Sequence, residues 1–344
     1  MLLTHTDHGL YCAAGDFFVD PWRPVARAVI THAHGDHASP GSAAYLCAAP
    51  GEGILRLRLG PEARIEPLPY GEPRRINGVT VSLHPAGHIL GSAQVRIEGE
   101  GEVWVVSGDY KTGPDPTCAP FAPVACDTFI TEATFGLPIY RWPPAAEVFA
   151  AVNAWWRANQ AAGRTSVLFA YALGKAQRVL AGVDPTIGPI YAHGAVHRLN
   201  NAYIDSGVRL PDWRYAGDAP PGADWSRALV IAPTSAQGTP WLRRFGEVST
   251  AFASGWMHVR GQRRRRSVDR GFVLSDHADW PGLLSAVAAG GARRVLVTHG
   301  YTAVLARYLR EQGLEAYELA SPWQGEALDE EVPEAEDEGR PGDG

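Results

Sequence analysis

The chain has 344 residues, of which 45% are hydrophobic and 20% charged, a globular composition with room for more than one folded unit. No run approaches the roughly 18 uninterrupted apolar residues of a membrane helix, and no basic-then-apolar leader opens the chain, so we expect a cytoplasmic protein without membrane contact. The four cysteines are scattered without C-x-x-C spacing, which argues against a disulfide framework and against a zinc knuckle.

The net charge of −6 is distributed unevenly along the chain. Residues 326–344 hold nine acidic residues and one arginine, which leaves the other 325 residues with a charge of +2. This segment has too little apolar surface to fold, so we expect an acidic disordered tail. Six arginines lie within eleven residues: Arg260, Arg263, Arg264, Arg265, Arg266 and Arg270. Such a run is either a solvated surface or a phosphate-binding patch.

The first 140 residues have the pattern of short strands that end at polar clusters. Residues 27–31, 79–83 and 103–106 are rich in apolar and β-branched residues, and each run stops just before a polar cluster. From residue 143, strand and helix signals alternate instead. The clearest are a helix over 145–162, a strand over 167–171 and a helix over 175–181. Strand patterns return at 271–274 and 294–297, so we expect one α/β domain interrupted by another.

The strongest signal is the sequence THAHGDH at residues 31–37, which places four potential metal ligands at the end of a strand. Neutral imidazole and carboxylate are the ligands that Zn²⁺ prefers in catalytic sites. His32 and His34 are two apart in an extended segment, so they project to the same side and can hold one ion. Asp36 and His37 follow where the chain turns, and they face a second ion. The alternative, a chance cluster of surface histidines, does not account for this spacing.

This segment resembles the signature of the metallo-β-lactamase superfamily, and three further motifs lie at the expected places. Asp20 in FVDPW resembles the first motif, an aspartate that orients metal ligands. His88 in PAGHILGS is similar to the third motif, and Asp109 in SGDY to the fourth, a carboxylate shared by two ions. The resemblance implies a first ion held by His32, His34, His88 and Asp109. It implies a second ion held by Asp36, His37, Asp109 and one more histidine.

Downstream, the chain resembles the β-CASP branch of that superfamily, which acts on nucleic acids. Glu132 in TEATFG is similar to motif A, and His277 in SDHAD to motif B, whose histidine faces the scissile phosphate. His299 in VTHG is similar to motif C, whose histidine completes the second metal site. The implied fold is an αββα sandwich over residues 1–140 and 267–325 with an inserted β-CASP α/β domain over 141–266.

Within the branch, the chain resembles the bacterial ligase-associated DNA-damage-response exonucleases. The segments that carry this resemblance are GLYC at 9–12, DPWRP at 20–24, SGDYK at 107–111 and RGFVLSDH at 270–277. The resemblance implies processing of DNA ends, with a DNA ligase and other repair proteins as candidate partners. His299 keeps RNA open, because a histidine there is typical of the RNA-processing members.

The implied cofactors are two divalent ions, zinc with manganese as a substitute, which activate a water and neutralise the phosphate. His277 is the candidate general acid, Glu132 would hold its imidazole, and Asp36 belongs to the catalytic set as well as to the ligands. Arg263 to Arg266 and Lys175 are the candidate contacts to the nucleic-acid backbone. A DNA exonuclease is therefore the leading hypothesis and an RNA endonuclease or exonuclease the alternative. A catalytically idle nucleic-acid-binding relative conflicts with the complete ligand set, and a small-molecule hydrolase leaves the insert unexplained.

Overall fold

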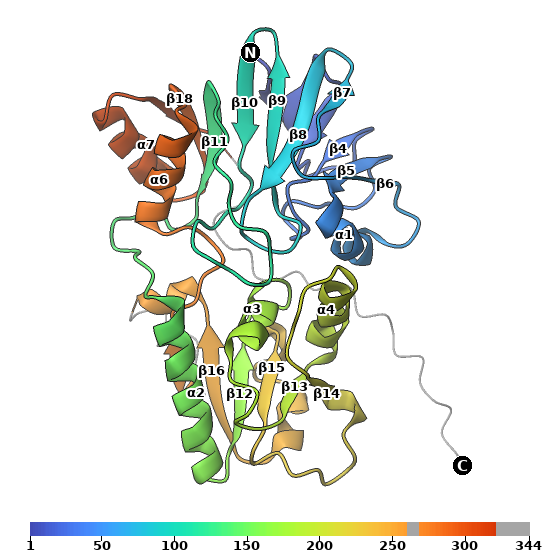
Figure 1. Cartoon of the computed structure of the whole chain (residues 1–344), viewed down its shortest axis with the longest axis vertical. Coiled ribbons are helices and arrows are strands. Elements are labelled where there is room, and N and C mark those ends of the chain that lie inside the picture. The colour runs from blue at the N-terminus through green and yellow to red at the C-terminus, as the bar shows by residue number, and fades with distance from the viewer. Residues whose placement is uncertain (260–267, 321–344) are drawn as a thin grey trace.

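The computed structural model describes residues 1–259 and 268–320, and the chain forms two bodies stacked along its longest axis (Figure 1). One body is built from the two ends of the described chain, and the other from the middle of it. The arginines 263–266 and the acidic segment 326–344, both singled out above, lie outside the described residues. No described helix has the length and apolar character needed to cross a membrane.

The first body contains two sheets. The six strands of the first sheet lie side by side in chain order: β1 (Thr4–Thr6), β2 (Gly9–Cys12), β3 (Phe17–Val19), β4 (Ala28–Val29), β5 (Tyr45–Ala48) and β6 (Ile65–Leu68). The second sheet has the order β19 (Glu315–Glu318), β18 (Arg294–Gly300), β11 (Thr128–Ala133), β10 (Glu102–Val106), β9 (Ala93–Gly99), β8 (Val79–Pro85) and β7 (Arg74–Ile76).

The two sheets pack face to face, and helices cover their outer faces. Alternate residues of a strand point to opposite faces. Val29 and Leu46 therefore enter the core between the sheets, whereas Ala28 and Tyr45 face α1 (Glu52–Leu59). Helices α6 (Trp280–Gly290) and α7 (Thr302–Glu311) cover the second sheet through a separate apolar core. The first body is thus a four-layer arrangement of helix, sheet, sheet and helix, a mixed α/β structure as the sequence predicts.

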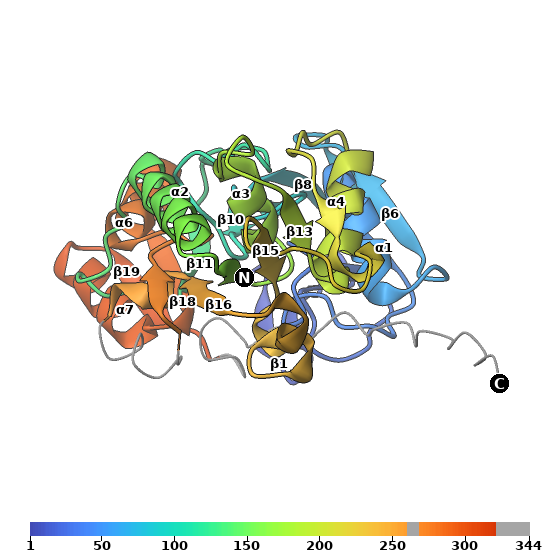
Figure 2. The ribbon, with the colours of Figure 1, turned by 90° about the horizontal axis from the view of Figure 1, so that it is seen from below.

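The second body is a six-stranded parallel sheet with helices. Its strand order is β14 (Arg214–Tyr215), β13 (Ile190–Ala192), β15 (Leu229–Ala232), β12 (Thr165–Phe169), β16 (Val248–Ala253) and β17 (Arg270–Phe272). Helices α2 (Ala145–Ala161), α3 (Lys175–Gly182) and α4 (Gly194–Asp205) pack through one apolar core on a single face, where Figure 2 shows them in a row. The expected helix 145–162 and helix 175–181 are therefore present. Because β17 pairs with β16, this sheet reaches past the boundary expected at residue 266.

The two bodies share a core where they meet. Leu173 and Tyr203 of the second body lie in one apolar cluster with Ile54 and Ile89 of the first. The carboxyl ends of β12 and β16 point toward the first body, so the loops that follow these strands lie at the junction (Figure 1). Loops at the carboxyl ends of parallel strands are where functional groups collect in such sheets. The junction is therefore where the candidate site should be sought.

Candidate metal centre

The loop that follows β4 is fixed by a single carboxylate. Asp20 accepts hydrogen bonds from the Thr31 amide at 2.8 Å, from the Thr31 hydroxyl at 2.6 Å and from His37 Nδ1 at 2.7 Å. Because Nδ1 of His37 donates outward to Asp20, its Nε2 atom is turned inward. This Nε2 atom is buried and makes no hydrogen bond within the described part of the chain. A buried ring nitrogen of this kind can bind a metal ion once it has lost its proton.

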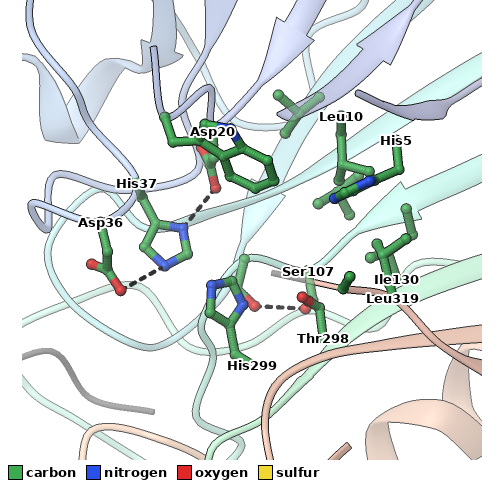
Figure 3. A pocket seen from close by; sticks show the side chains of 15 residues that line it. His5, Leu10, Asp20, Asp36, His37, Ser107, Ile130, Thr298, His299 and Leu319 are labelled. Carbon is green, nitrogen blue, oxygen red and sulfur yellow. Dashed lines mark hydrogen bonds and ion pairs between the residues drawn. The ribbon is translucent and has the colours of Figure 1, made fainter. Parts of the chain in front are cut away.

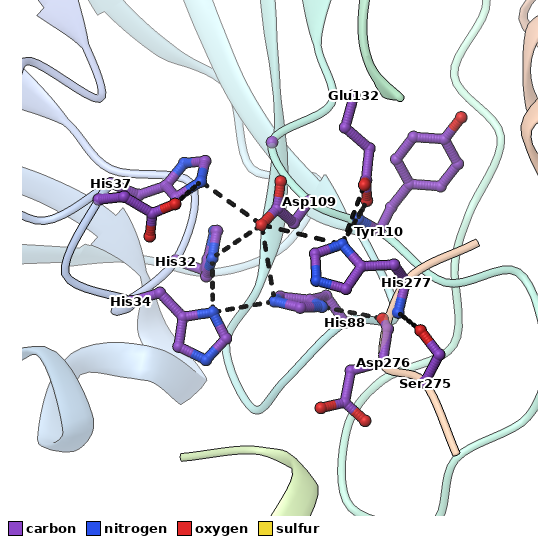
Figure 4. Close-up of polar contacts among 12 residues, drawn as sticks. His32, His34, His37, His88, Asp109, Tyr110, Glu132, Ser275, Asp276 and His277 are labelled. Atoms are coloured by element: carbon purple, nitrogen blue, oxygen red, sulfur yellow. Dashed lines mark hydrogen bonds and ion pairs between the residues drawn. The ribbon is translucent and has the colours of Figure 1, made fainter. Parts of the chain in front are cut away.

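Three imidazoles converge here, two from this loop and one from the turn that follows β8 (Figure 4). His34 Nδ1 lies 3.1 Å from His32 Nε2 and 3.0 Å from His88 Nε2. Asp109 Oδ2 lies 3.7 Å from His32 Nε2 and 3.9 Å from His88 Nε2. Mutual hydrogen bonds cannot satisfy three ring nitrogens facing one centre, whereas a cation at that centre satisfies all of them. The geometry therefore fits a metal ion held by three nitrogens and one oxygen.

Backbone carbonyls set the orientation of two of these rings. His34 Nε2 donates to the carbonyl of Leu173 at 3.2 Å, and His88 Nδ1 donates to the carbonyl of Asp276 at 2.8 Å. Each bond fixes the tautomer and leaves the other ring nitrogen for the cluster. Burial lowers the pKa of His32 and of His88 well below the usual value, which keeps these rings in the neutral form that binds metals.

A second group is formed by Asp36, His37 and His299. Asp36 Oδ2 lies 3.6 Å and Asp109 Oδ2 lies 3.5 Å from His37 Nε2, so Asp109 connects this group to the first. Although burial opposes the charged form, the carboxylates of Asp36 and Asp109 raise the pKa of His37 well above its usual value. Negative charge is therefore concentrated where a second cation would bind.

His299 reaches this group through an irregularity in the second sheet. The register between β11 and β18 pairs Glu132 with Thr298 and Ala133 with Gly300, so His299 is an extra residue of a bulge. Its φ of 55° and stacking against the His37 ring at 5.3 Å follow from this placement. Bulges commonly re-aim side chains next to functional sites. Figure 3 shows His299 and His37 at one side of a pocket between the two sheets.

A third feature is the buried pair of Glu132 and His277. Both Glu132 oxygens lie near His277 Nδ1, at 3.0 and 2.9 Å, and Oε1 also accepts the Tyr110 amide at 2.7 Å. The Trp142 indole donates to the His277 carbonyl at 2.9 Å, and His277 Nδ1 lies 4.0 Å from Asp109 Oδ2. The backbone and the ring of His277 are thus both held at the edge of the first metal group.

The structure brings together every residue that the sequence analysis assigned to metal binding, with Asp20 behind them and Glu132 and His277 beside them. Lys175 is placed differently from what a contact to nucleic acid requires. Its side chain is 1% exposed, with Nζ 3.6 Å from Asp276 Oδ2 and 4.3 Å from the centre of the Tyr171 ring. Sequence reasoning assigned no role to the acidic partners Asp115, which lies outside the quoted motifs, and Asp276, which lies inside SDHAD beside His277.

Sequence comparisons find relatives that align with this chain over only part of their own length. No protein-family model matches the chain. A probable DNA ligase of Opitutus terrae is 34% identical over 91% of this chain and 30% of that protein. A ribonuclease of Thermus thermophilus is 32% identical over 41% of this chain and 31% of that protein. The endoribonuclease ysh1 of Emericella nidulans is 32% identical over 34% of this chain and 13% of that protein. The chain therefore spans less than a third of the length of these relatives.

One solved structure supports the fold. A protein of unknown function from Enterococcus faecalis superimposes with a TM-score of 0.55 at 12% identity, over 87% of this chain and 80% of that one. The likeness extends over both bodies of the molecule. At this identity it shows a shared mixed α/β fold.

Proposed function

We propose that the chain is a metal-dependent nuclease that hydrolyses phosphodiester bonds of DNA, with a metallo-β-lactamase sandwich and an inserted β-CASP domain. The observation that carries the proposal is the junction of the two ligand groups at Asp109, with His277 beside them. The relatives named as nucleases support the reaction class. We place the second domain boundary after β17 rather than at residue 266, because β17 completes the third sheet.

Two divalent ions fit the donor atoms, and we propose zinc, with manganese as a working substitute. The first ion would be held by His32, His34, His88 and Asp109, and the second by Asp36, His37, Asp109 and His299. Such ions supply charge neutralisation at the phosphate and a water that is deprotonated near neutral pH. The nitrogen and oxygen donors, with no cysteine among them, are consistent with this chemistry.

Side chains of the protein would supply the proton that the leaving oxygen requires. With Nδ1 of His277 donating to Glu132, the opposite ring nitrogen Nε2 is the atom that can give a proton to a substrate. Glu132 fixes the ring and stabilises its protonated form. Asp20 performs the corresponding task for His37, since it receives the outer N–H of that ring and holds the loop.

DNA is the proposed substrate because the ligase-named relative matches 91% of this chain, whereas the ribonuclease of Thermus thermophilus matches 41%. We propose processing of DNA ends beside a DNA ligase, as an exonuclease. The alternative is an RNA endonuclease or exonuclease, which the ribonuclease names and the histidine at 299 favour.

The test is cleavage of matched single-stranded DNA, duplex DNA and RNA of one sequence, labelled at either end. We expect metal-dependent loss of DNA, with product ladders that separate end digestion from internal cuts. Asp109→Ala, purified in parallel, controls for contaminating nucleases. Preferential cleavage of RNA would select the alternative, and equal cleavage by Asp109→Ala would refute the proposal.

A further inference from the structure

We propose that Arg178 and Lys175, both in α3 of the inserted domain, are positioning residues for the metal centre. They hold the chain at Asp276, and through it they orient His88 and locate His277. This inference rests on the metal centre of the proposed function. It assigns to the inserted domain a part in building that centre, in addition to any contact with substrate.

The carboxylate of Asp276 points away from the metal ligands (Figure 4). It contacts the side chains of Arg178 and Lys175. Arg178 Nη1 lies 3.5 Å from Oδ1 of Asp276, and Lys175 Nζ lies 3.6 Å from Oδ2. Arg178 also donates to the backbone carbonyl of Ser275. The three charged side chains are between 1% and 9% exposed, so water does not compete for these contacts. In such surroundings each charge needs its partner in place.

Arg178 joins a second acidic residue of the first body to the same point. Its Nε atom lies 3.2 Å from Asp115 Oδ2, and Lys111 Nζ lies 3.3 Å from that oxygen. Asp115 follows the metal ligand Asp109 by six residues, and Asp276 immediately precedes His277. The guanidinium of Arg178 therefore connects two segments of the chain. One carries Asp109, the carboxylate shared by both ligand groups, and the other carries His277, the candidate acid. The planar fork of arginine suits this task, because it presents several donors in fixed directions.

The consequence for the metal ligands passes through the backbone. The carbonyl of Asp276 is the group that accepts the Nδ1 hydrogen of His88 at 2.8 Å. Arg178 contacts the carbonyl of Ser275 and the side chain of Asp276. These two contacts restrict rotation of the peptide group that contains the Asp276 carbonyl. Without these contacts the Asp276 carbonyl can rotate away, and His88 loses the hydrogen bond that fixes its tautomer.

The start of α3 supports the centre at a second point. The carbonyl of Leu173 accepts the Nε2 hydrogen of His34 at 3.2 Å, and Gly174 follows with a φ of +88°. A Cβ atom at Gly174 would lie only 2.2 Å from Ile89 Cγ2, beside His88. This turn is thus packed directly against the metal-binding loop. Two of the three histidines in the first ligand group are oriented by this helix, one directly and one through Asp276.

The experiment compares four variants by a measurement that needs no substrate. The variants are Arg178→Met, Arg178→Lys, Lys175→Met and the control Arg157→Met. Arg157 lies in the same body, and its pair with Asp184 is 57% exposed on the arginine side. The probe is Co²⁺, added to metal-free protein and followed by its visible absorption, whose shape reports the ligand geometry. Metal affinity is measured by competition with a chelator, and turnover by kcat and KM.

We expect Arg178→Met to weaken Co²⁺ binding or kcat by about 10- to 100-fold, the range seen when groups behind metal ligands are removed. Its absorption should change shape, its KM should stay near the wild-type value, and Arg178→Lys should recover part of the loss. Lys175→Met should change the same quantities less. Arg157→Met should match the wild type throughout.

Two results would overturn the inference. In the first, the variants have a lower melting temperature but unchanged Co²⁺ spectra and affinity, which would mean that the contacts of Arg178 and Lys175 only stabilise the fold. A higher KM with a flatter salt dependence and unchanged kcat would make these residues contacts to phosphate. If Arg178→Met does not fold, the Co²⁺ affinity and absorption of Arg178→Lys and Lys175→Met test the inference instead. If the wild type binds Co²⁺ but cleaves no nucleic acid, the proposed function fails, while the spectra still decide the inference.

Discussion

The two carboxylate oxygens of Glu132 lie 3.0 and 2.9 Å from Nδ1 of His277, and both side chains are buried. The same carboxylate accepts the amide of Tyr110 at 2.7 Å, so it is itself fixed. A buried imidazole held in this way can exchange a proton only through its other nitrogen. The pair therefore separates the task of orienting the ring from the task of donating the proton.

Replacing His277 tests the second task. We expect His277→Ala to retain the full metal content and to lose about 10²- to 10⁴-fold in kcat, the usual contribution of a general acid. A substrate with a better leaving group should recover much of the loss, since it needs no proton. Metal analysis and kcat on both substrates check this. Loss of metal from the variant would instead make His277 a ligand.

Replacing Glu132 tests the first task. Glu132→Gln keeps the shape of the side chain but removes the charge that stabilises protonated His277. We expect kcat to fall by less than in His277→Ala, and the double variant to be no worse than His277→Ala, because the two residues act as one unit. The kcat values of the three variants at saturating substrate provide the test. Losses that multiply in the double variant would show independent roles.

Asp109 lies between the two ligand groups, with Oδ2 3.5 Å from His37 Nε2 and 3.7 Å from His32 Nε2. Asp109→Ala should therefore lose metal from both groups, whereas His299→Ala should lose metal from one. Measured ions per chain, after equal dialysis against a low free metal concentration, check the difference. Retention of one tightly bound ion by Asp109→Ala would show that the carboxylate is not shared.

The metal-free protein should lose stability as the pH falls from 7 to 5. Burial lowers the pKa of His32 and of His88 well below the value of 6.5 expected in the unfolded chain. Below about pH 6.5 the unfolded chain then binds more protons than the folded one, so unfolding is favoured. His37 has a raised pKa, and its stabilisation is complete below pH 6.5 and lost only at higher pH.

Urea unfolding of chelator-treated protein at pH 7, 6 and 5 measures this trend. His88→Gln removes one of the responsible groups without adding a charge, so its stability should depend less on pH. A metal-free protein that is as stable at pH 5 as at pH 7 would contradict the assignment of neutral buried imidazoles.

The sequence predicted that the candidate ligands of THAHGDH would lie close together, because it places four of them within one loop after a strand, and the structure brings them into two adjoining groups. It also predicted α2 and α3 to within a few residues, since their apolar periodicity is regular. The bulge at His299 was not predictable, because it arises from the pairing of β18 with β11 and not from either strand alone.

The positions of Lys175 and Arg178 were missed for a related reason. A helical lysine or arginine is usually solvated, and no local pattern indicates that Asp276, 98 residues from Arg178, is buried against it. The strand expected at 271–274 was assigned to the first body, yet the observed strand β17 pairs with β16 in the second. Contacts between segments distant in sequence determine both the burial of these two side chains and the pairing of β17. Local sequence patterns hold no information about such contacts.

We propose that this chain cleaves nucleic acid with two metal ions held by the two ligand groups that adjoin at Asp109. The most direct measurement is a titration of metal-free protein with Mn²⁺ or Zn²⁺ in which bound metal and cleavage of end-labelled DNA are followed together. We expect cleavage that rises to a plateau at about two ions per chain, as in other two-metal sites, and none in Asp109→Ala. Full cleavage by chelator-treated protein with no bound metal would contradict it.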